Sequence, residues 1–163
     1  MDIIEGKVWK FGDHIDTDAI VPGRFLSSPV ADIMPHAFEG MKPEFASEVS
    51  EGDIIMAGRN FGCGSSREQA PAVLKALGIR CVVAESFGRI FFRNAVAIGL
   101  PTLAGSDISG NFEEGDTAAI DLPAAQLINR TKGTSFKATP LSPDMLDIIQ
   151  RGGILELIKS HTK

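Results

Sequence analysis

The chain has 163 residues, of which 44% are hydrophobic, and carries a net charge of −5 with an isoelectric point near 5.2. This length and hydrophobic content fit one globular domain, residues 1–163, with a sizeable core. The acidic balance argues against nucleic acid or an anionic membrane as the main partner. No apolar run reaches the length of a membrane span and the N-terminus lacks a basic-then-apolar signal, so we expect a cytoplasmic protein.

The N-terminal third predicts little regular structure after its first strand. Residues 3–11 alternate weakly between apolar and polar side chains, which favours a strand. Residues 12–18 are polar and turn-like. Residues 21–34 contain two prolines, a glycine and two serines, a composition typical of a mobile loop that runs into a short helix. Residues 41–50 favour a helix that proline interrupts.

The middle third predicts alternating strands and helices. A strand over 53–57 is followed by a glycine-rich turn and a helix-periodic stretch, 70–77. The β-branched run 80–84 is typical of a buried parallel strand. A second helical stretch, 88–98, and a short strand, 100–103, complete the series. This order predicts a βαβαβ unit with a parallel sheet.

The last third of the sequence has a different residue pattern. Residues 117–121, 126–131 and 135–138 are short β-like pieces separated by Gly, Pro and Asn, which indicates a second, antiparallel sheet as an additional small β layer. Residues 143–150 and 154–160 predict two short C-terminal helices. The predicted fold class is therefore α/β.

The segment 60–70, Asn-Phe-Gly-Cys-Gly-Ser-Ser-Arg-Glu-Gln-Ala, carries the strongest chemical signal. Ser65 and Ser66 each stand three residues before a Glu or Gln, so either serine is placed to cap the following helix. Two hydroxyls and the Arg67 guanidinium at a helix N-terminus predict a carboxylate or phosphate pocket that contains a proton-transfer group. A capped turn with a solvated arginine fits the spacing equally well.

The chain has two cysteines, too few for a disulfide framework or for an iron–sulfur cluster, which needs about four ligands. Cys81 lies in an apolar run and is interpreted as a buried core residue. Cys63 lies inside the glycine turn, where bordering a ligand and a structural role both remain open. The three histidines are scattered without metal-type pairing. We therefore expect no cofactor or metal to be bound by this chain.

Several motifs in order resemble the swivel domain of the aconitase superfamily. They are Asp16–Ile20, Pro22-Gly23-Arg24, Gly64–Glu68, Glu85–Ile90, Gly99-Leu100-Pro101 and Gly152–Leu155. The chain looks like a free-standing small subunit of the isopropylmalate/homoaconitate dehydratase type. The resemblance implies a swivelling β/β/α domain.

This resemblance also implies a partner. In the family, a separate large subunit supplies three cysteines for a 4Fe–4S cluster, and the small subunit closes over that site. We accordingly expect a heterodimer or heterotetramer, a small diacid substrate, and no activity of this chain alone.

The resemblance assigns roles to individual residues. Ser65 carries over as the catalytic base, in the alkoxide form, and Asp18 as an active-site carboxylate that orients other groups. Ser66 and Arg67 carry over as binders of a substrate carboxylate, for which a planar guanidinium fork is well suited. Arg24 is a further candidate for substrate binding, although its spacing is shorter than in aconitases. From spacing alone, the acidic run at Asp18 predicts only a polar turn.

The loop after Gly23 bears on the substrate. Homoaconitase-type small subunits resemble Tyr-Leu-Arg-Thr there, and their arginine reads an additional distal carboxylate. This chain has Phe25-Leu26-Ser27-Ser28 instead. Because a buried third carboxylate without a cation is costly, Phe25 and Ser27 favour an isopropyl or methyl group in that place. The expected function is interconversion of 2- and 3-isopropylmalate by dehydration and rehydration, a step of leucine biosynthesis.

Two alternatives remain open at this point. One is a related hydro-lyase, such as a homoaconitase or a citraconate/methylmalate or dimethylmalate dehydratase, because apolar pockets discriminate methylenes weakly. The other is a non-catalytic anion-binding module with the same fold.

Overall fold

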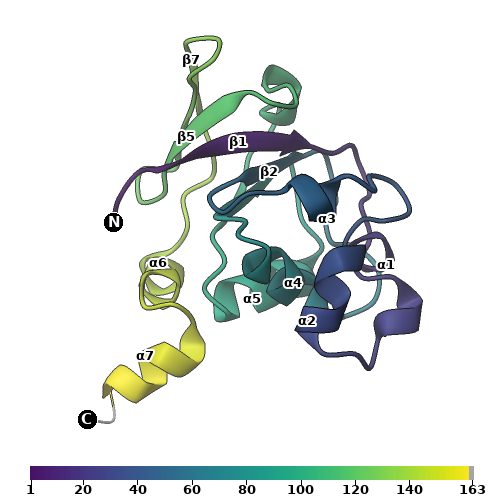
Figure 1. Cartoon of the computed structure of the whole chain (residues 1–163). Coiled ribbons are helices and arrows are strands. Elements are labelled where there is room, and N and C mark those ends of the chain that lie inside the picture. The colour runs from purple at the N-terminus through teal and green to yellow at the C-terminus, as the bar shows by residue number, and fades with distance from the viewer. Residues whose placement is uncertain (162–163) are drawn as a thin grey trace.

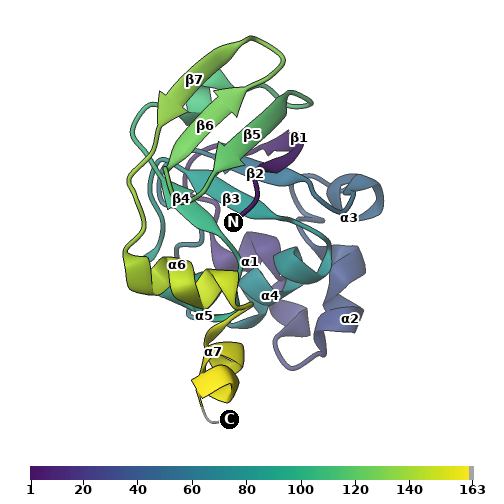
Figure 2. The ribbon, with the colours of Figure 1, turned by 90° about the vertical axis from the view of Figure 1, so that its left-hand side faces the viewer.

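The computed structural model describes residues 1–161. Seven strands form one mixed sheet in the order β4-β3-β2-β1-β5-β6-β7 (Figures 1 and 2). The strands are β1 Ile4–Lys10, β2 Ile54–Ala57, β3 Cys81–Ala84, β4 Thr102–Ala104, β5 Thr117–Asp121, β6 Gln126–Asn129 and β7 Thr134–Lys137. Strands β1 to β4 are parallel and β5 to β7 are antiparallel.

The predicted α/β class and its βαβαβ unit are confirmed. The unit runs through β2, α4, β3, α5 and β4. The three antiparallel strands are also present, but the prediction of a second sheet is wrong. Strand β1 pairs with β2 on one edge and with β5 on the other, so the additional β layer continues the same sheet. Figure 2 shows these strands rising above the parallel part.

Seven α-helices and three 3₁₀ turns are found among residues 1–161. They are α1 Thr17–Ile20, η1 Gly23–Phe25, α2 Val30–Ile33, η2 Met34–His36, α3 Phe45–Glu48, α4 Gln69–Ala76, α5 Arg89–Ala97, η3 Ser109–Asn111, α6 Pro143–Gln150 and α7 Ile154–His161. The two predicted C-terminal helices are confirmed. None of the helices in this part of the chain is long and apolar enough to cross a lipid bilayer.

Alternation along the strands separates two hydrophobic cores. In β2 all four residues are buried, yet Ile55 and Ala57 point into the core under α2, α4 and α5. Ile54 and Met56 point into the other core, which β5, β6 and α6 close. A parallel strand buried on both faces reads as a continuous apolar run, which is why the sequence revealed these strands.

The connections that leave the parallel strands are tied together by backbone hydrogen bonds. Gly62 N donates to Ile15 O (2.6 Å), Thr17 N to Cys63 O (2.9 Å), and Phe61 N to Ser86 O (3.0 Å). These connections follow the carboxyl ends of β1, β2 and β3, where open α/β sheets bind ligands. The ties bring the Asp18 motif and the serine motif to one place, although about fifty residues separate them.

Candidate functional site

The glycine turn before α4 has a backbone that few other residues can adopt. Gly62 and Gly64 have positive φ angles of 78° and 98°. At Gly62 a Cβ would lie 2.3 Å from Cγ of Phe91, so the phenyl ring of α5 packs directly on the glycine backbone. Positive φ and this close approach both require glycine at position 62.

Neither serine caps α4, contrary to the prediction. The N-cap is Glu68 and no side chain makes a capping hydrogen bond. The chain instead forms a tight turn, in which Arg67 N donates to Ser65 O (3.0 Å), before the helix begins. Ser65 and Ser66 are both exposed. Their hydroxyls are therefore available to a ligand rather than committed to the helix.

Thr17 is a residue of this site that sequence reasoning missed. Its side chain is buried, and its Oγ1 donates to Ser65 O at 2.9 Å and lies 3.4 Å from Ser65 Oγ. Thr17 is the first residue of α1, so these contacts hold the serine turn against that helix. The signal was present, because Thr17 lies inside the motif Asp16-Thr17-Asp18.

Arg67 joins the two motifs. Its Nη1 donates to Asp18 Oδ1 at 2.9 Å and to Val21 O at 2.8 Å. The arginine side chain is only 15% exposed, whereas that of Asp18 is 65% exposed. The buried Nε of Arg67 has no hydrogen-bond partner among the described residues. A buried donor without an acceptor costs free energy, so this nitrogen is an unsatisfied group at the junction of the two motifs.

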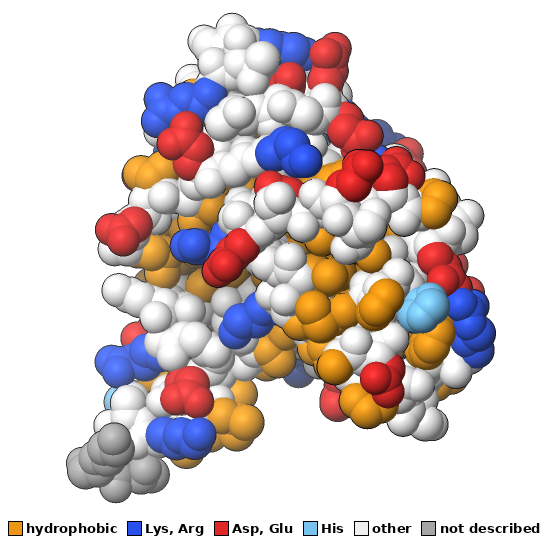
Figure 3. Space-filling view, viewed as in Figure 1, with side chains coloured by type: hydrophobic (Ala, Val, Ile, Leu, Met, Phe, Trp, Pro, Cys, Tyr) orange, Lys and Arg blue, Asp and Glu red, His pale blue; other side chains and the backbone are white. Residues whose placement is uncertain are grey.

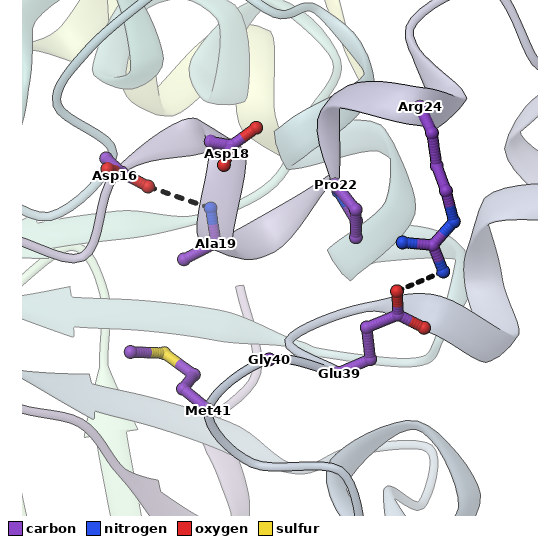
Figure 4. A pocket seen from close by; sticks show the side chains of 8 residues that line it. All are labelled: Asp16, Asp18, Ala19, Pro22, Arg24, Glu39, Gly40 and Met41. Carbon is purple, nitrogen blue, oxygen red and sulfur yellow. Dashed lines mark hydrogen bonds and ion pairs between the residues drawn. The ribbon is translucent and has the colours of Figure 1, made fainter.

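A pocket of about 370 Å³ opens beside α1. It is lined by Asp16, Asp18, Ala19, Pro22, Arg24, Glu39, Gly40 and Met41. Figure 4 shows the α1 residues on one side and residues 39–41 on the other, with the Arg24 side chain extending to Glu39. The carboxylate of Asp16 caps α1 by accepting from Ala19 N (2.8 Å). Two of the predicted site residues, Asp18 and Arg24, therefore share one pocket.

The other residues predicted in the substrate loop lie outside this lining. Phe25 stacks on His36 with ring centroids 4.4 Å apart and packs against the core. Ser27 is exposed on the turn that follows. Gln69 Nε2, at the start of α4, donates to Leu26 O (2.6 Å), which fastens the loop to the helix behind the serine motif. The loop is therefore tied to α4, the helix that follows the serine motif.

The two cysteines differ in environment. Cys63 is partly exposed, pairs with Asp16 through a backbone bridge, and borders a second pocket beside Gly64. Cys81 is buried in β3, and this burial raises the pKa of its thiol. Residues 1–161 contain no group of three or more His, Cys, Asp or Glu side chains that could hold a metal ion. The donors present do not fit an iron–sulfur cluster.

Known proteins resemble this chain over nearly its whole length. The family model for the aconitase C-terminal domain matches residues 39–107. A 3-isopropylmalate dehydratase small subunit from Thermodesulfovibrio yellowstonii is 51% identical, over 97% of this chain and 95% of that protein. A methanogen homoaconitase small subunit from Methanothermobacter thermautotrophicus is 49% identical, over 94% of this chain and 89% of that protein.

A solved structure shows the same fold. The crystal structure of a 3-isopropylmalate dehydratase from Methanocaldococcus jannaschii superimposes with a TM-score of 0.93 at 38% identity, over 99% of this chain and 96% of that chain. The resemblance inferred from the motifs is therefore confirmed along the whole chain. The protein belongs to the family of 3-isopropylmalate dehydratase and homoaconitase small subunits, within the aconitase superfamily.

Proposed function

We propose that this chain is the small subunit of a 3-isopropylmalate dehydratase, a hydro-lyase that interconverts 2- and 3-isopropylmalate in the cytoplasm. The observation that best supports the proposal is the contact between the serine motif and the Asp18 motif. Arg67 binds Asp18 on one side while its Nε lacks an acceptor, directly after the exposed Ser65 and Ser66. A hydroxyl pair next to an arginine is the arrangement that proton removal beside a bound carboxylate needs.

Ser65 is the proposed base. In the dehydration it takes the proton from the carbon alpha to a carboxylate, and in the rehydration it returns a proton to the neighbouring carbon. A serine is a very weak base unless its surroundings favour the alkoxide and exclude water. The Thr17 hydroxyl donates a hydrogen bond to Ser65 O (2.9 Å), and this contact fixes the backbone from which the Ser65 hydroxyl projects.

Ser66 and Arg67 are the proposed carboxylate clamp. Arg67 has one nitrogen occupied by Asp18 and Val21 O, so its plane is fixed before substrate arrives. The arginine side chain is 15% exposed, and in this proposal its accessible guanidinium nitrogens donate to a substrate carboxylate. Asp18 acts by orienting this guanidinium.

Departure of the substrate's hydroxide requires a Lewis acid, and we propose that a partner subunit supplies it. In this proposal the large subunit would hold a 4Fe–4S cluster, which would supply the Lewis acid that assists the departure of the hydroxyl group. The large subunit would also exclude water from the exposed serines. Figure 3 shows hydrophobic side chains gathering over α2 and α3. Met41, which lines the pocket, and Leu26 are also exposed hydrophobic residues, and we propose that the large subunit covers the pocket and this hydrophobic face.

Homoaconitase is the second candidate, because a homoaconitase small subunit is nearly as similar as the isopropylmalate dehydratases. Overall identity therefore does not decide the substrate. The loop favours isopropylmalate, since Ser27 is small, neutral and exposed where a homoaconitase-type subunit places an arginine. A third carboxylate would have no cation there.

The test is anaerobic turnover of the chain reconstituted with its cluster-loaded large subunit. The substrates are isopropylmalate, homoaconitate, citraconate and dimethylmalate, each supplied to the wild type and to Ser27→Arg. We expect turnover of isopropylmalate by the wild type and gain of homoaconitate turnover by Ser27→Arg. Preference of the wild type for another diacid would replace the proposed substrate. A stable complex without any turnover would favour the non-catalytic module.

A further inference from the structure

Four side chains form a closed ring at the rim of the α1 pocket. Arg24 makes an ion pair with Glu39 through Nη2 and Oε1. Glu39 Oε2 lies 2.7 Å from His36 Nδ1. The His36 ring stacks on Phe25 (4.4 Å, interplanar angle 26°), and the guanidinium carbon of Arg24 lies 4.6 Å from the centre of the same Phe25 ring. Each member contacts two others.

The ring connects two segments that are separate in sequence. Arg24 and Phe25 belong to η1, whereas His36 ends η2 and Glu39 follows it. Glu39 connects the two segments, because one of its carboxylate oxygens contacts Arg24 and the other contacts His36. With 30% of its side chain exposed, Glu39 lines the pocket from behind the arginine.

We propose that Glu39 is a positioning residue for Arg24. It holds the guanidinium over Phe25 in the orientation that binds the second carboxylate of the diacid. This inference rests on the proposed function, because it assigns Arg24 a substrate carboxylate.

The geometry favours positioning by Glu39 over competition with the substrate. An exposed Arg–Glu pair contributes little by itself and would break readily. Glu39 is anchored at its other oxygen by His36, which the Phe25 ring holds by stacking. A carboxylate fixed in this way restricts the arginine rotamers and leaves the other guanidinium nitrogens for a ligand. Arg24 itself remains 60% exposed, so it is open to the pocket side.

The role of Glu39 is limited to substrate binding in this proposal. Arg24 and Glu39 line the pocket, whereas Ser65 is not among its lining residues and is held by Thr17. Loss of Glu39 should therefore weaken the binding of the substrate and leave the proton transfer unchanged. The predicted signature is a rise in KM without a fall in kcat.

The experiment is a double-mutant cycle in the reconstituted enzyme with isopropylmalate. We expect Glu39→Ala to raise KM about tenfold and Glu39→Gln, which keeps an acceptor for Arg24, to raise it less. Arg24→Ala should raise KM at least as much. The double variant should then be no worse than Arg24→Ala, because Glu39 acts only through that side chain. Glu5→Ala, which removes the carboxylate of an exposed ion pair with Arg130 on the sheet, is the matched control and should keep the KM of the wild type.

Each outcome separates the two proposals. A KM effect of Glu39→Ala that adds fully to that of Arg24→Ala would overturn the positioning role. So would a Glu39→Ala variant with unchanged or lower KM, which would make Glu39 neutral or a competitor. If the wild type turns over a diacid but Arg24→Ala keeps its KM, only the inference about this ring fails. If the wild type turns over none of the diacids, the proposed function fails first.

Discussion

The site depends on two arginines that are each tied to a carboxylate of the same chain. Arg67 contacts Asp18 and a backbone carbonyl, whereas Arg24 contacts Glu39. Burial separates them, because the side chain of Arg67 is 15% exposed and that of Arg24 is 60% exposed. The carboxylates offset the positive charge in the isolated subunit and set the direction of each guanidinium. In the proposed enzyme, an arriving diacid would therefore meet cations that are already oriented.

Replacing Arg67 with Lys should damage the enzyme although the charge is retained. Lysine lacks the planar fork that contacts Asp18, Val21 O and a ligand together. We expect kcat/KM to fall about 100-fold or more. Circular dichroism and complex formation with the large subunit should match the wild type. A lysine variant with near wild-type kcat/KM would show that only charge is needed.

The pKa of the Glu39 carboxyl should depend on its contacts with His36 and Arg24. Hydrogen bonding from His36, followed by the contact with Arg24, lowers the pKa of the Glu39 carboxyl below its ordinary value. A lowered pKa stabilises the folded chain above the ordinary glutamate pKa. This stabilisation is lost as pH falls through the pKa in the folded state.

The measurement is a carbon-detected NMR titration of the Glu39 carboxyl group. In the wild type it should titrate below the ordinary glutamate value, and His36→Phe, which keeps the stacked ring, should move it back towards that value. Identical titrations of Glu39 in both proteins would mean that His36 does not hold the carboxylate.

At the scale of elements, the turn between β2 and α4 depends on one glycine and its neighbours. Gly62 is pressed against Phe91, which itself contacts Phe61 and Phe87 at ring distances of 5.3 Å and 6.1 Å. The glycine was recognisable from sequence, but the partner ring was not. The position of the serines thus depends on packing between α5 and the turn.

Gly62→Ala should destabilise the fold by about 2 kcal/mol or more, because the added methyl group meets Phe91 and the φ angle is positive. Gly110→Ala, where the added methyl would meet nothing within 4 Å, should change stability by about 0.5 kcal/mol or less. Urea unfolding of both variants measures the difference. Equal stability of the two variants would show that the turn relaxes.

The sequence predicted the parallel elements well because β2 and β3 are buried on both faces and read as apolar runs. It failed on the capping of α4. Tertiary contacts decided that point, since Thr17 donates to Ser65 O and Arg67 donates to Asp18, both from the segment around α1. Local spacing contains no information on these contacts.

At the scale of the molecule, the site lies where three strand ends meet, and the far half of the sheet contributes none of its lining. The motifs around Asp18 and Ser65 were predicted from sequence through a family resemblance. Glu39 was not, because its partner Arg24 is fifteen residues away in an irregular stretch. The spacing of His36 and Glu39, i and i+3, was a visible signal for their contact alone. What remained hidden was the way the segment between β1 and β2 folds over the strand ends.

The measurement that tests the account most directly compares Ser65→Ala with Ser66→Ala in the reconstituted, cluster-loaded enzyme. If Ser65 is the base, its variant should bind the large subunit and isopropylmalate normally but lose about 1,000-fold or more in kcat. The Ser66 variant should mainly raise KM. Wild-type kcat in Ser65→Ala, with the complex intact, would contradict the assignment of the base and with it the proposed mechanism.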